Sequence, residues 1–258
     1  MARIYPLFSS SKGNSTFIGS PTEGILIDAG VSYKKLISAL DVCGISIDAV
    51  KAVFVTHDHS DHIAGIKMLT KKHNIPVYAR HETIGKLISC DCVGSCGYEA
   101  DGEVEIGGIK VVSFPTPHDT EGSCGYRITT SDGKTCAVCT DVGRITEEVA
   151  DGITGCDVVM LEANYDEEML RHGSYPSYLK IRISNGTGHL SNIKCGEMIR
   201  KLLSGGTMRF ILGHLSQDNN TPSTACATVE GCLDGFVRNK DYILEVAPVE
   251  TTGYCMPF

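Results

Sequence analysis

The sequence predicts an α/β fold in which buried strands alternate with helices. Apolar, β-branched runs at 25–27, 50–55 and 157–161 have the length and composition of strands that are buried on both faces. Segments with apolar residues at helical spacing follow, as at 33–40 and 191–203. Reactive polar residues come directly after several strands, and open α/β sheets keep their sites at the carboxyl ends of strands. We therefore expect an α/β protein with one such site.

The composition indicates one large folded unit. The chain has 258 residues, 42% of them hydrophobic, which suffices for one core, and we predict a single domain over 1–258. No apolar run approaches the roughly 18 residues of a membrane span, and residues 1–15 lack an apolar stretch of signal-peptide length. The 12 cysteines are then expected to be reduced thiols in the cytoplasm.

The charge balance limits the partners of the chain. Lys and Arg total 23 against 31 Asp and Glu, a net charge of -8. This argues against a broadly basic surface that coats nucleic acid, but it allows a local basic groove. Bound metal would neutralise part of the acidity.

The first part of the chain is predicted to start with strands. Residues 3–8 look like a strand, and a hydroxyl-rich loop at 9–16 follows. With its flexible backbone and one ammonium group, that loop could cradle a phosphate, but it could equally be a polar turn. A strand at 25–30 then ends in an acid and two small residues, and a helix is expected over 33–40.

The segment Thr56-His57-Asp58-His59-Ser60-Asp61-His62 is the strongest functional signal. It lies between strand 50–55 and a helix predicted over 63–73. Imidazoles and carboxylates this close repel one another or must be desolvated unless a cation holds them. His57 and His59 can converge on one ion, whereas Asp61 and His62 point to a neighbouring position. Imidazole and carboxylate without thiolate suit Zn, Mn or Fe(II) in an incomplete, catalytic shell.

The middle of the chain is predicted to be mostly β-structure. A strand at 76–79 and a helix at 81–88 precede two hairpins, at 104–114 and 126–140. The thiols of the segment 90–96 could bind a metal, but no fourth ligand is suitably spaced. A lid loop with free thiols is the preferred interpretation.

Cys136 and Cys139 have the spacing of a redox pair. In a strand, however, residues three apart face opposite sides, so we predict no such pair.

The last part is predicted to alternate strands with helices. Ser191 or Asn192 is expected to cap a helix, and Thr221 with Pro222 to open another. The predicted strands are 157–161, 208–212 and 242–246.

Several buried strands end in a residue type that binds metal. One such residue alone usually caps a turn, but their recurrence favours a single polynuclear site. The residues are His57, His118, Asp141, Glu162 and His214.

These residues resemble the metallo-β-lactamase superfamily, whose fold is a four-layer αββα sandwich of two mixed β-sheets flanked by helices. Residues 57–62 fit its specific signature His-x-His-x-Asp-His. Asp28 matches the first motif, a buried acid that supports the histidine loop. His118, Asp141 and His214 resemble the third, fourth and last motifs.

The resemblance implies two divalent metal ions per chain, Zn, Mn or Fe. Asp58 would not bind metal and is expected to orient a histidine or the attacking water. The implied ligands are His57, His59 and His118 for one metal, Asp61, His62 and His214 for the other, and Asp141 between them.

Within the superfamily the chain resembles the WalJ (YycJ) group from about Ile4 to Val246. That group is associated with 5′-to-3′ exonuclease activity on double-stranded DNA, and its relatives include tRNase Z. His189 and Glu162 match a non-ligand histidine and its acid that assist the leaving group in tRNase Z-like enzymes. The chain has neither a long basic arm nor an inserted β-CASP domain, and the segment 90–96 has no counterpart in the group. The supporting stretches are 9–15, 161–166, 169–176, 188–192 and 213–220.

The resemblance therefore implies a binuclear metal-dependent phosphodiesterase, with a metal-bound hydroxide as the nucleophile. His189, oriented by Glu162, would protonate the departing oxygen. DNA is favoured over RNA as the substrate, and no membrane partner or oligomeric state is indicated. The expected catalytic residues are Asp58, Asp61, Glu162 and His189. The expected contacts to backbone phosphates are Ser11, Lys12, Asn14, Ser216 and Asn219.

Three other functions use the same fold. RNA processing and hydrolysis of a small ester, thioester (as in glyoxalase II) or β-lactam share the metal loop, although the small-molecule reactions leave the His189 motif unexplained. A non-catalytic scaffold would usually have lost ligands, whereas all seven implied positions are filled.

Overall fold

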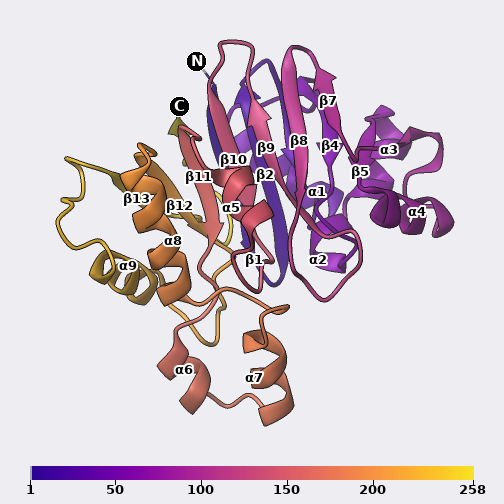
Figure 1. The fold of residues 1–258 in the computed structure, drawn as a ribbon. Coiled ribbons are helices and arrows are strands. Elements are labelled where there is room, and N and C mark those ends of the chain that lie inside the picture. The colour runs from indigo at the N-terminus through magenta and orange to yellow at the C-terminus, as the bar shows by residue number, and fades with distance from the viewer. Residues whose placement is uncertain (1) are drawn as a thin grey trace.

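Two seven-stranded β-sheets face each other, and helices cover the outer face of each (Figure 1). The computed structural model describes residues 2–258. Apolar side chains form three clusters, one between the sheets and one under the helices on each outer side. This four-layer αββα arrangement confirms the fold expected from the sequence.

The first sheet comes from the N-terminal part of the chain, with the C-terminal strand at its edge. Its order is β14-β1-β2-β3-β4-β5-β6. Helices α1 (Tyr33–Val42), α3 (Ile66–His73) and α4 (His81–Ser89) pack on its outer face. The strands are β1 (Arg3–Ser10), β2 (Gly13–Ser20), β3 (Glu23–Ile27), β4 (Val50–Phe54), β5 (Val77–Ala79), β6 (Gly97–Glu99) and β14 (Met256–Pro257).

The second sheet has the order β13-β12-β11-β10-β9-β8-β7. Helices α5 (Glu147–Ile153), α8 (Asn192–Ser204) and α9 (Pro222–Gly231) cover its outer face, whereas α6 (Glu167–His172) and α7 (Ser177–Ser184) stand away from the layers (Figure 1). The strands are β7 (Glu103–Ile106), β8 (Ile109–Pro115), β9 (Cys124–Thr129), β10 (Thr135–Cys139), β11 (Val158–Glu162), β12 (Arg209–Gly213) and β13 (Ile243–Val246).

Aromatic packing joins the two sheets where β4 ends. The Tyr126 ring contacts the Phe54 ring edge-on, with 5.6 Å between centroids. The Tyr126 hydroxyl donates a hydrogen bond of 2.7 Å to the Val55 carbonyl oxygen. Because Val55 directly precedes the segment 56–62, these contacts fix the histidine segment relative to the second sheet.

The prediction of a hydroxyl-rich loop at 9–16 is wrong. Most of it is strand, because β1 and β2 form a hairpin with only Ser11 and Lys12 between them. The sequence misled because its polar residues are buried and bonded to protein atoms. Ser15 Oγ, for example, donates to the Asp28 carbonyl oxygen at 2.9 Å. Only Ser11 and Lys12 of this segment lie in an exposed turn.

The prediction of a single helix over 63–73 is also wrong. The chain forms a short helix α2 (Ser60–Ile63), breaks at Ala64 and Gly65, and resumes as α3. A Cβ atom on Gly65 would lie 2.6 Å from the Val31 carbonyl oxygen, so close packing requires glycine at the break. The sequence did not predict strands β2, β6 and β14 or helix α5. It also did not predict the bounds of helix α2 or the end of helix α9. The other predicted elements are present with small shifts at their ends.

The predicted placement of Cys136 and Cys139 on opposite faces of a strand is confirmed. Cys136 is buried between the sheets and Cys139 under the outer helices, so the two thiols lie on opposite faces of β10. Cys90 Sγ lies 3.0 Å from Cys92 Sγ. Within residues 2–258, no group of three potential metal ligands includes a cysteine.

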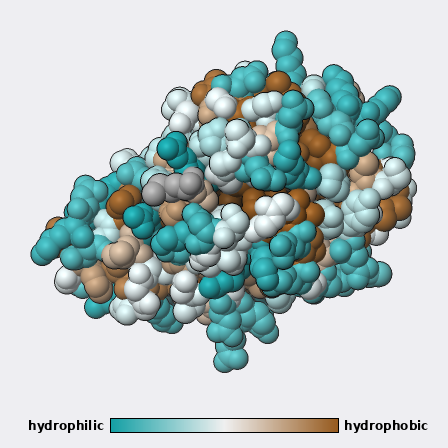
Figure 2. All heavy atoms as spheres, turned by 90° about the horizontal axis from the view of Figure 1, so that it is seen from above, coloured by the Kyte–Doolittle hydropathy of each residue, from teal (hydrophilic) through white to brown (hydrophobic). Residues whose placement is uncertain are grey.

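The end of the molecule where both termini lie is mostly hydrophilic, with hydrophobic side chains gathered toward its middle (Figure 2). None of the helices in residues 2–258 has the length and apolar character needed to span a bilayer.

Candidate metal centre

Five strand ends converge at the end of the molecule opposite the termini. The residues that follow β4, β8, β10 and β12, and the last residue of β11, lie within one cluster. This confirms that the predicted strand-end residues meet. They are His57, His118, Asp141, Glu162 and His214.

Three residues of the cluster have left-handed backbones. Asp28, Asp141 and His214 have φ angles of 60°, 56° and 54°, each within two residues of the end of a strand. Such a conformation costs about 1–3 kcal/mol in a non-glycine residue and persists only where its surroundings enforce it. At His214, the Ser9 hydroxyl accepts from the backbone N–H at 2.7 Å, and Asn164 donates to the carbonyl at 2.8 Å. These bonds hold the sharp turn that directs the imidazole into the cluster.

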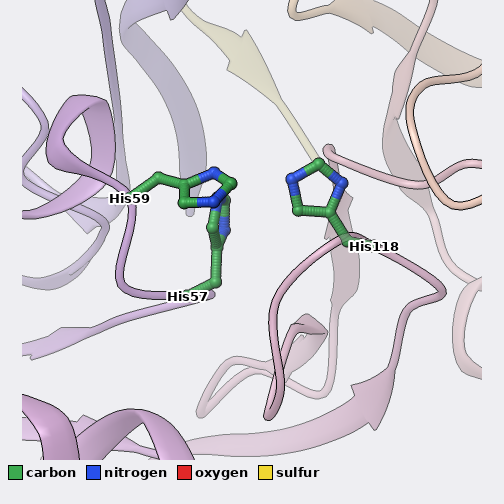
Figure 3. Close-up of side chains that lie close together, drawn as sticks. All are labelled: His57, His59 and His118. Atoms are coloured by element: carbon green, nitrogen blue, oxygen red, sulfur yellow. The ribbon is translucent and has the colours of Figure 1, made fainter. Parts of the chain in front are cut away.

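The first group of potential ligands consists of His57, His59 and His118. One nitrogen atom from each ring lies within 4.8 Å of the others. Figure 3 shows the two rings from the histidine segment facing the His118 ring across the site. Ring centroids are 4.6 Å apart for His57 and His59, and 5.0 Å apart for His57 and His118.

The second group consists of Asp61, His62 and His214, whose ligand atoms also lie within 4.8 Å of one another. His62 is fully buried, and Asp61 is half-buried beside the surface hollow. Asn14 Nδ2 lies 3.1 Å from His62 Nε2 and donates to Asp61 Oδ2 at 3.3 Å.

Hydrogen bonds at Nδ1 fix the tautomers of four histidines. His62 Nδ1 donates to Asp28 Oδ2 at 2.7 Å, and His214 Nδ1 donates to Glu162 Oε1 at 2.8 Å. His118 Nδ1 donates to a backbone carbonyl at 3.0 Å. His57 Nδ1 donates to the Thr56 hydroxyl at 3.0 Å, since that hydroxyl donates to Asp28. In each ring this leaves Nε2 as the nitrogen available to a metal, the arrangement found in metal-binding histidines.

Asp141 lies between the two groups. Its Oδ2 is 3.3 Å from His62 Nε2, and its Oδ1 is 3.9 Å from His118 Nε2. Burial alone would raise the pKa of Asp141, but the adjacent His214 and His62 rings hold it well below its usual range. The carboxylate is therefore ionised and reaches both groups.

The donor atoms fit divalent metal ions. Four buried site atoms have no hydrogen-bond partner within residues 2–258: His57 Nε2, His118 Nε2, His214 Nε2 and Asp141 Oδ2. An unsatisfied buried polar atom costs about 1–3 kcal/mol, and all four are of types that ligate metals. Burial, with the neighbouring His62, lowers the pKa of His57 and keeps that ring neutral, which is the form that binds a metal.

His189 and Glu162 form the predicted pair. His189 Nδ1 lies 2.9 Å from Glu162 Oε1, the same oxygen that accepts from His214. The other oxygen accepts from the backbone N–H groups of Val142 and Leu190 at 2.9 and 3.1 Å. Burial would lower the pKa of His189, but the Glu162 carboxylate raises it to about 9.

Asp58 connects the histidine segment to neighbouring elements. Its Oδ1 accepts from the Thr120 hydroxyl at 2.7 Å and from Lys86 Nζ on α4 at 3.2 Å. Within the described part of the chain it makes no hydrogen bond to a histidine, so its expected role in orienting one stays a prediction.

The predicted phosphate contacts separate into two sets. Ser11 and Ser216 line a hollow of about 250 Å³ in front of the two ligand groups. Asn14 and Asn219 are buried, with 5% and 1% of their surface exposed, so they face the protein interior. Lys12 is exposed but does not line the hollow.

Asp119 and Arg182 were not predicted to belong to the site. Asp119 Oδ1 lies 3.3 Å from His118 Nε2 and 3.6 Å from His59 Nε2. Arg182, on α7, donates from Nε to Asp119 Oδ2 at 2.7 Å. Burial would raise the pKa of Asp119, but the bond from Arg182 lowers it overall. Its position directly after His118 is the one sequence signal that could have identified Asp119.

We expect Asp28→Asn to destabilise the metal-free protein by about 3–5 kcal/mol, the cost of removing one partner from a buried charged network. Asp28 accepts from the Thr56 N–H and hydroxyl at 2.8 and 2.9 Å, besides the bond from His62. Asparagine tolerates the left-handed backbone but lacks the charge. Urea unfolding measures the change, with the exposed Asp41→Asn as the control. Equal unfolding midpoints for both variants would contradict this role.

The fold and this cluster define a metallo-β-lactamase-fold hydrolase. A solved structure of the metallo-beta-lactamase fold protein YhfI from Bacillus subtilis superimposes with a TM-score of 0.71 at 15% identity, covering 97% of this chain and 98% of that one. Similarity at that identity shows the fold alone.

Sequence comparison identifies the family. Residues 24–215 match the Beta-lactamase superfamily domain. Exodeoxyribonuclease WalJ of Streptococcus pneumoniae serotype 2 (strain D39) is 34% identical over 229 residues, covering 86% of this chain and 85% of that protein. Exodeoxyribonuclease YycJ of Bacillus anthracis is 33% identical over 232 residues, 88% of each chain. The chain therefore belongs to the WalJ/YycJ family of the beta-lactamase superfamily, as its motifs indicated.

Proposed function

We propose that this chain is a binuclear metal-dependent phosphodiesterase that acts as a 5′-to-3′ exonuclease on double-stranded DNA. The observation that carries the proposal is the His189–Glu162 pair, which lies beside the two proposed ligand groups and belongs to neither, although with Asp141 and His214 it forms a further group of potential ligands. The exodeoxyribonuclease names of the WalJ and YycJ relatives support a nucleic acid substrate, with DNA favoured over RNA.

Two divalent ions, Zn, Mn or Fe, fit the donor atoms. The proposed ligands are those implied by the superfamily motifs, with Asp141 shared. When bound, such ions polarise phosphate oxygens and lower the pKa of water. The ligand groups are His57, His59 and His118, and Asp61, His62 and His214.

His189 is proposed to give a proton to the departing oxygen. Glu162 holds Nδ1, so Nε2 is the nitrogen free for the transfer, and His189 lines the hollow in front of the ligand groups. Because Glu162 is fully buried and accepts from two backbone N–H groups, it is fixed and holds the ring in one orientation. A positioned general acid typically contributes about 10²–10⁴-fold to the rate.

The proposed contacts to substrate phosphates are Ser11 and Ser216, which line this hollow. Asn14 has a different proposed role. Because it is buried and donates to Asp61, it positions that carboxylate. A cytoplasmic location is proposed from the twelve cysteines, all of which are free thiols.

The test is nuclease activity of the metal-reconstituted protein with Mn and with Zn. Duplex DNA labelled at the 5′ end should release its labelled nucleotide first, and the same duplex labelled at the 3′ end should give a ladder of shortening products. Single-stranded DNA and a structured RNA are compared, and Asp61→Ala is the inactive control.

The contrary result would be intact nucleic acids despite two bound metals. Turnover of a thioester or a chromogenic lactam by the same preparation would then identify a small-molecule hydrolase.

A further inference from the structure

A second and larger hollow, of about 780 Å³, lies next to the metal centre. Residues of α6, α7 and α8 line it, together with the segment 143–145, and α6 and α7 stand below α8 in Figure 1. His189 lines both this hollow and the smaller one in front of the ligand groups. The imidazole proposed as the proton donor is therefore part of the wall between them.

Helix α7 also separates the two hollows. Lys180 and Ser184 line the larger one, whereas Leu179, Arg182 and Ile183 line the smaller one. The bond from Arg182 to Asp119 ties this helix to the metal centre. A strand that passes His189 would thus leave the reacting phosphate and enter the larger hollow along α7.

Positive side chains gather in the larger hollow although the whole chain has a net charge of -8. Two carboxylates, Glu167 and Glu197, also line it, and Glu197 pairs with Lys194 at 2.9 Å. Arg171 pairs with Glu168 on its own helix. The other three cations have no carboxylate within 4.0 Å among residues 2–258. The five cations are Arg144, Arg171, Lys180, Lys194 and Lys201.

The floor of the same hollow is apolar. Tyr165, Leu170, Leu190 and Met198 line it, and each has no more than 8% of its surface exposed. Lys194 and Lys201 stand on one face of α8, seven residues and thus about 10 Å apart. Along a duplex axis the charges of one strand recur about every 3.4 Å, so two lysines this far apart can contact phosphates of the same strand. Cations above an apolar floor suit a strand with charged phosphates and flat bases.

We propose that this hollow binds the part of the nucleic acid strand that continues beyond the reacting phosphate. The inference rests on the proposed function, which supplies the nucleic acid substrate and the role of His189 as proton donor. The strand crosses His189 at the reacting phosphate, and its phosphates contact Arg144, Lys194 and Lys201.

The test compares Lys194→Gln/Lys201→Gln with a matched control, Lys34→Gln/Lys71→Gln, which removes two exposed lysines from α1 and α3. Binding of a fluorescent single-stranded phosphorothioate 12-mer, which resists cleavage, is measured by anisotropy at several salt concentrations. In the hollow variant we expect about tenfold weaker binding for each lysine removed. The slope of log K against log salt should fall by about 1.4, or about 0.7 for each phosphate that loses its lysine. The control variant should match the unmodified protein.

A second readout uses hydrolysis by the metal-loaded protein. The hollow variant should raise KM for an oligonucleotide while leaving kcat/KM unchanged for bis(p-nitrophenyl) phosphate, which has no strand to occupy the hollow. Equal behaviour of the hollow and control variants would overturn the inference, and so would binding of a mononucleotide as tight as that of the 12-mer. If the unmodified protein hydrolyses neither substrate, the proposed function is refuted. The anisotropy result would still show whether the hollow binds the strand.

Discussion

Asp141→Asn is expected to weaken metal binding by about 10²- to 10⁴-fold. Removing one charge from a buried ionic cluster costs about 3–5 kcal/mol, and about 1.4 kcal/mol corresponds to a tenfold change in affinity. Asp141 is the carboxylate that approaches the rings of both ligand groups, so both ions should be affected. Asparagine keeps the shape and tolerates the left-handed backbone, so the fold should be retained.

Metal content after dialysis and calorimetric titration with Mn and Zn measure this change. Asp151→Asn, an exposed position on α5, is the matched control and should bind metal like the unmodified protein. The unmodified protein should also unfold at a higher temperature when metal is added, because metal binds the folded state. Two tightly bound ions in Asp141→Asn would remove this residue from the ligand set.

His189→Ala should lower the rate of DNA hydrolysis by about 10²–10⁴-fold while both metals remain bound. His189 belongs to neither proposed ligand group, and Glu162 retains its bonds to His214 and to two backbone N–H groups. The loss should therefore appear in kcat, with metal content unchanged.

The leaving group separates a proton donor from a merely structural residue. A p-nitrophenolate ion departs without a proton, so hydrolysis of bis(p-nitrophenyl) phosphate should fall much less than hydrolysis of DNA in His189→Ala. His172→Ala, at an exposed histidine on α6, should be neutral with both substrates. Equal losses with the two substrates would mean that His189 positions the site and does not supply the proton.

Most of the predictions from the sequence came from local patterns of residue type and spacing. The segment 56–62 contains several potential ligands close together, so their spacing alone predicted two metals. His118, Asp141 and His214 were found because parallel strands bring their carboxyl ends to one edge. The superfamily motifs added the pairing of His189 with Glu162, whose residues are 27 positions apart.

What the sequence did not predict depends on tertiary contacts. The polar residues of 9–16 look like a loop until the second sheet buries them and the backbone of His214 meets the Ser9 hydroxyl. Asp119 joins the site because Arg182, 63 residues further along the chain, reaches back to it from α7. The break at Gly65 follows from the proximity of the Val31 carbonyl, which no local pattern contains. Helical periodicity and turn preferences carry no information about such tertiary contacts.

The proposed ligands are divided between the two sheets. The histidine segment extends from the first sheet, whereas His118, Asp141 and His214 extend from the second. Each sheet carries only part of the proposed ligand set, and neither part alone can hold both ions. Binding of both ions would therefore require docked sheets, and each ion would connect residues from both sheets. Metal should therefore stabilise the docked sheets, and the protein should resist unfolding and proteolysis better with metal than without it.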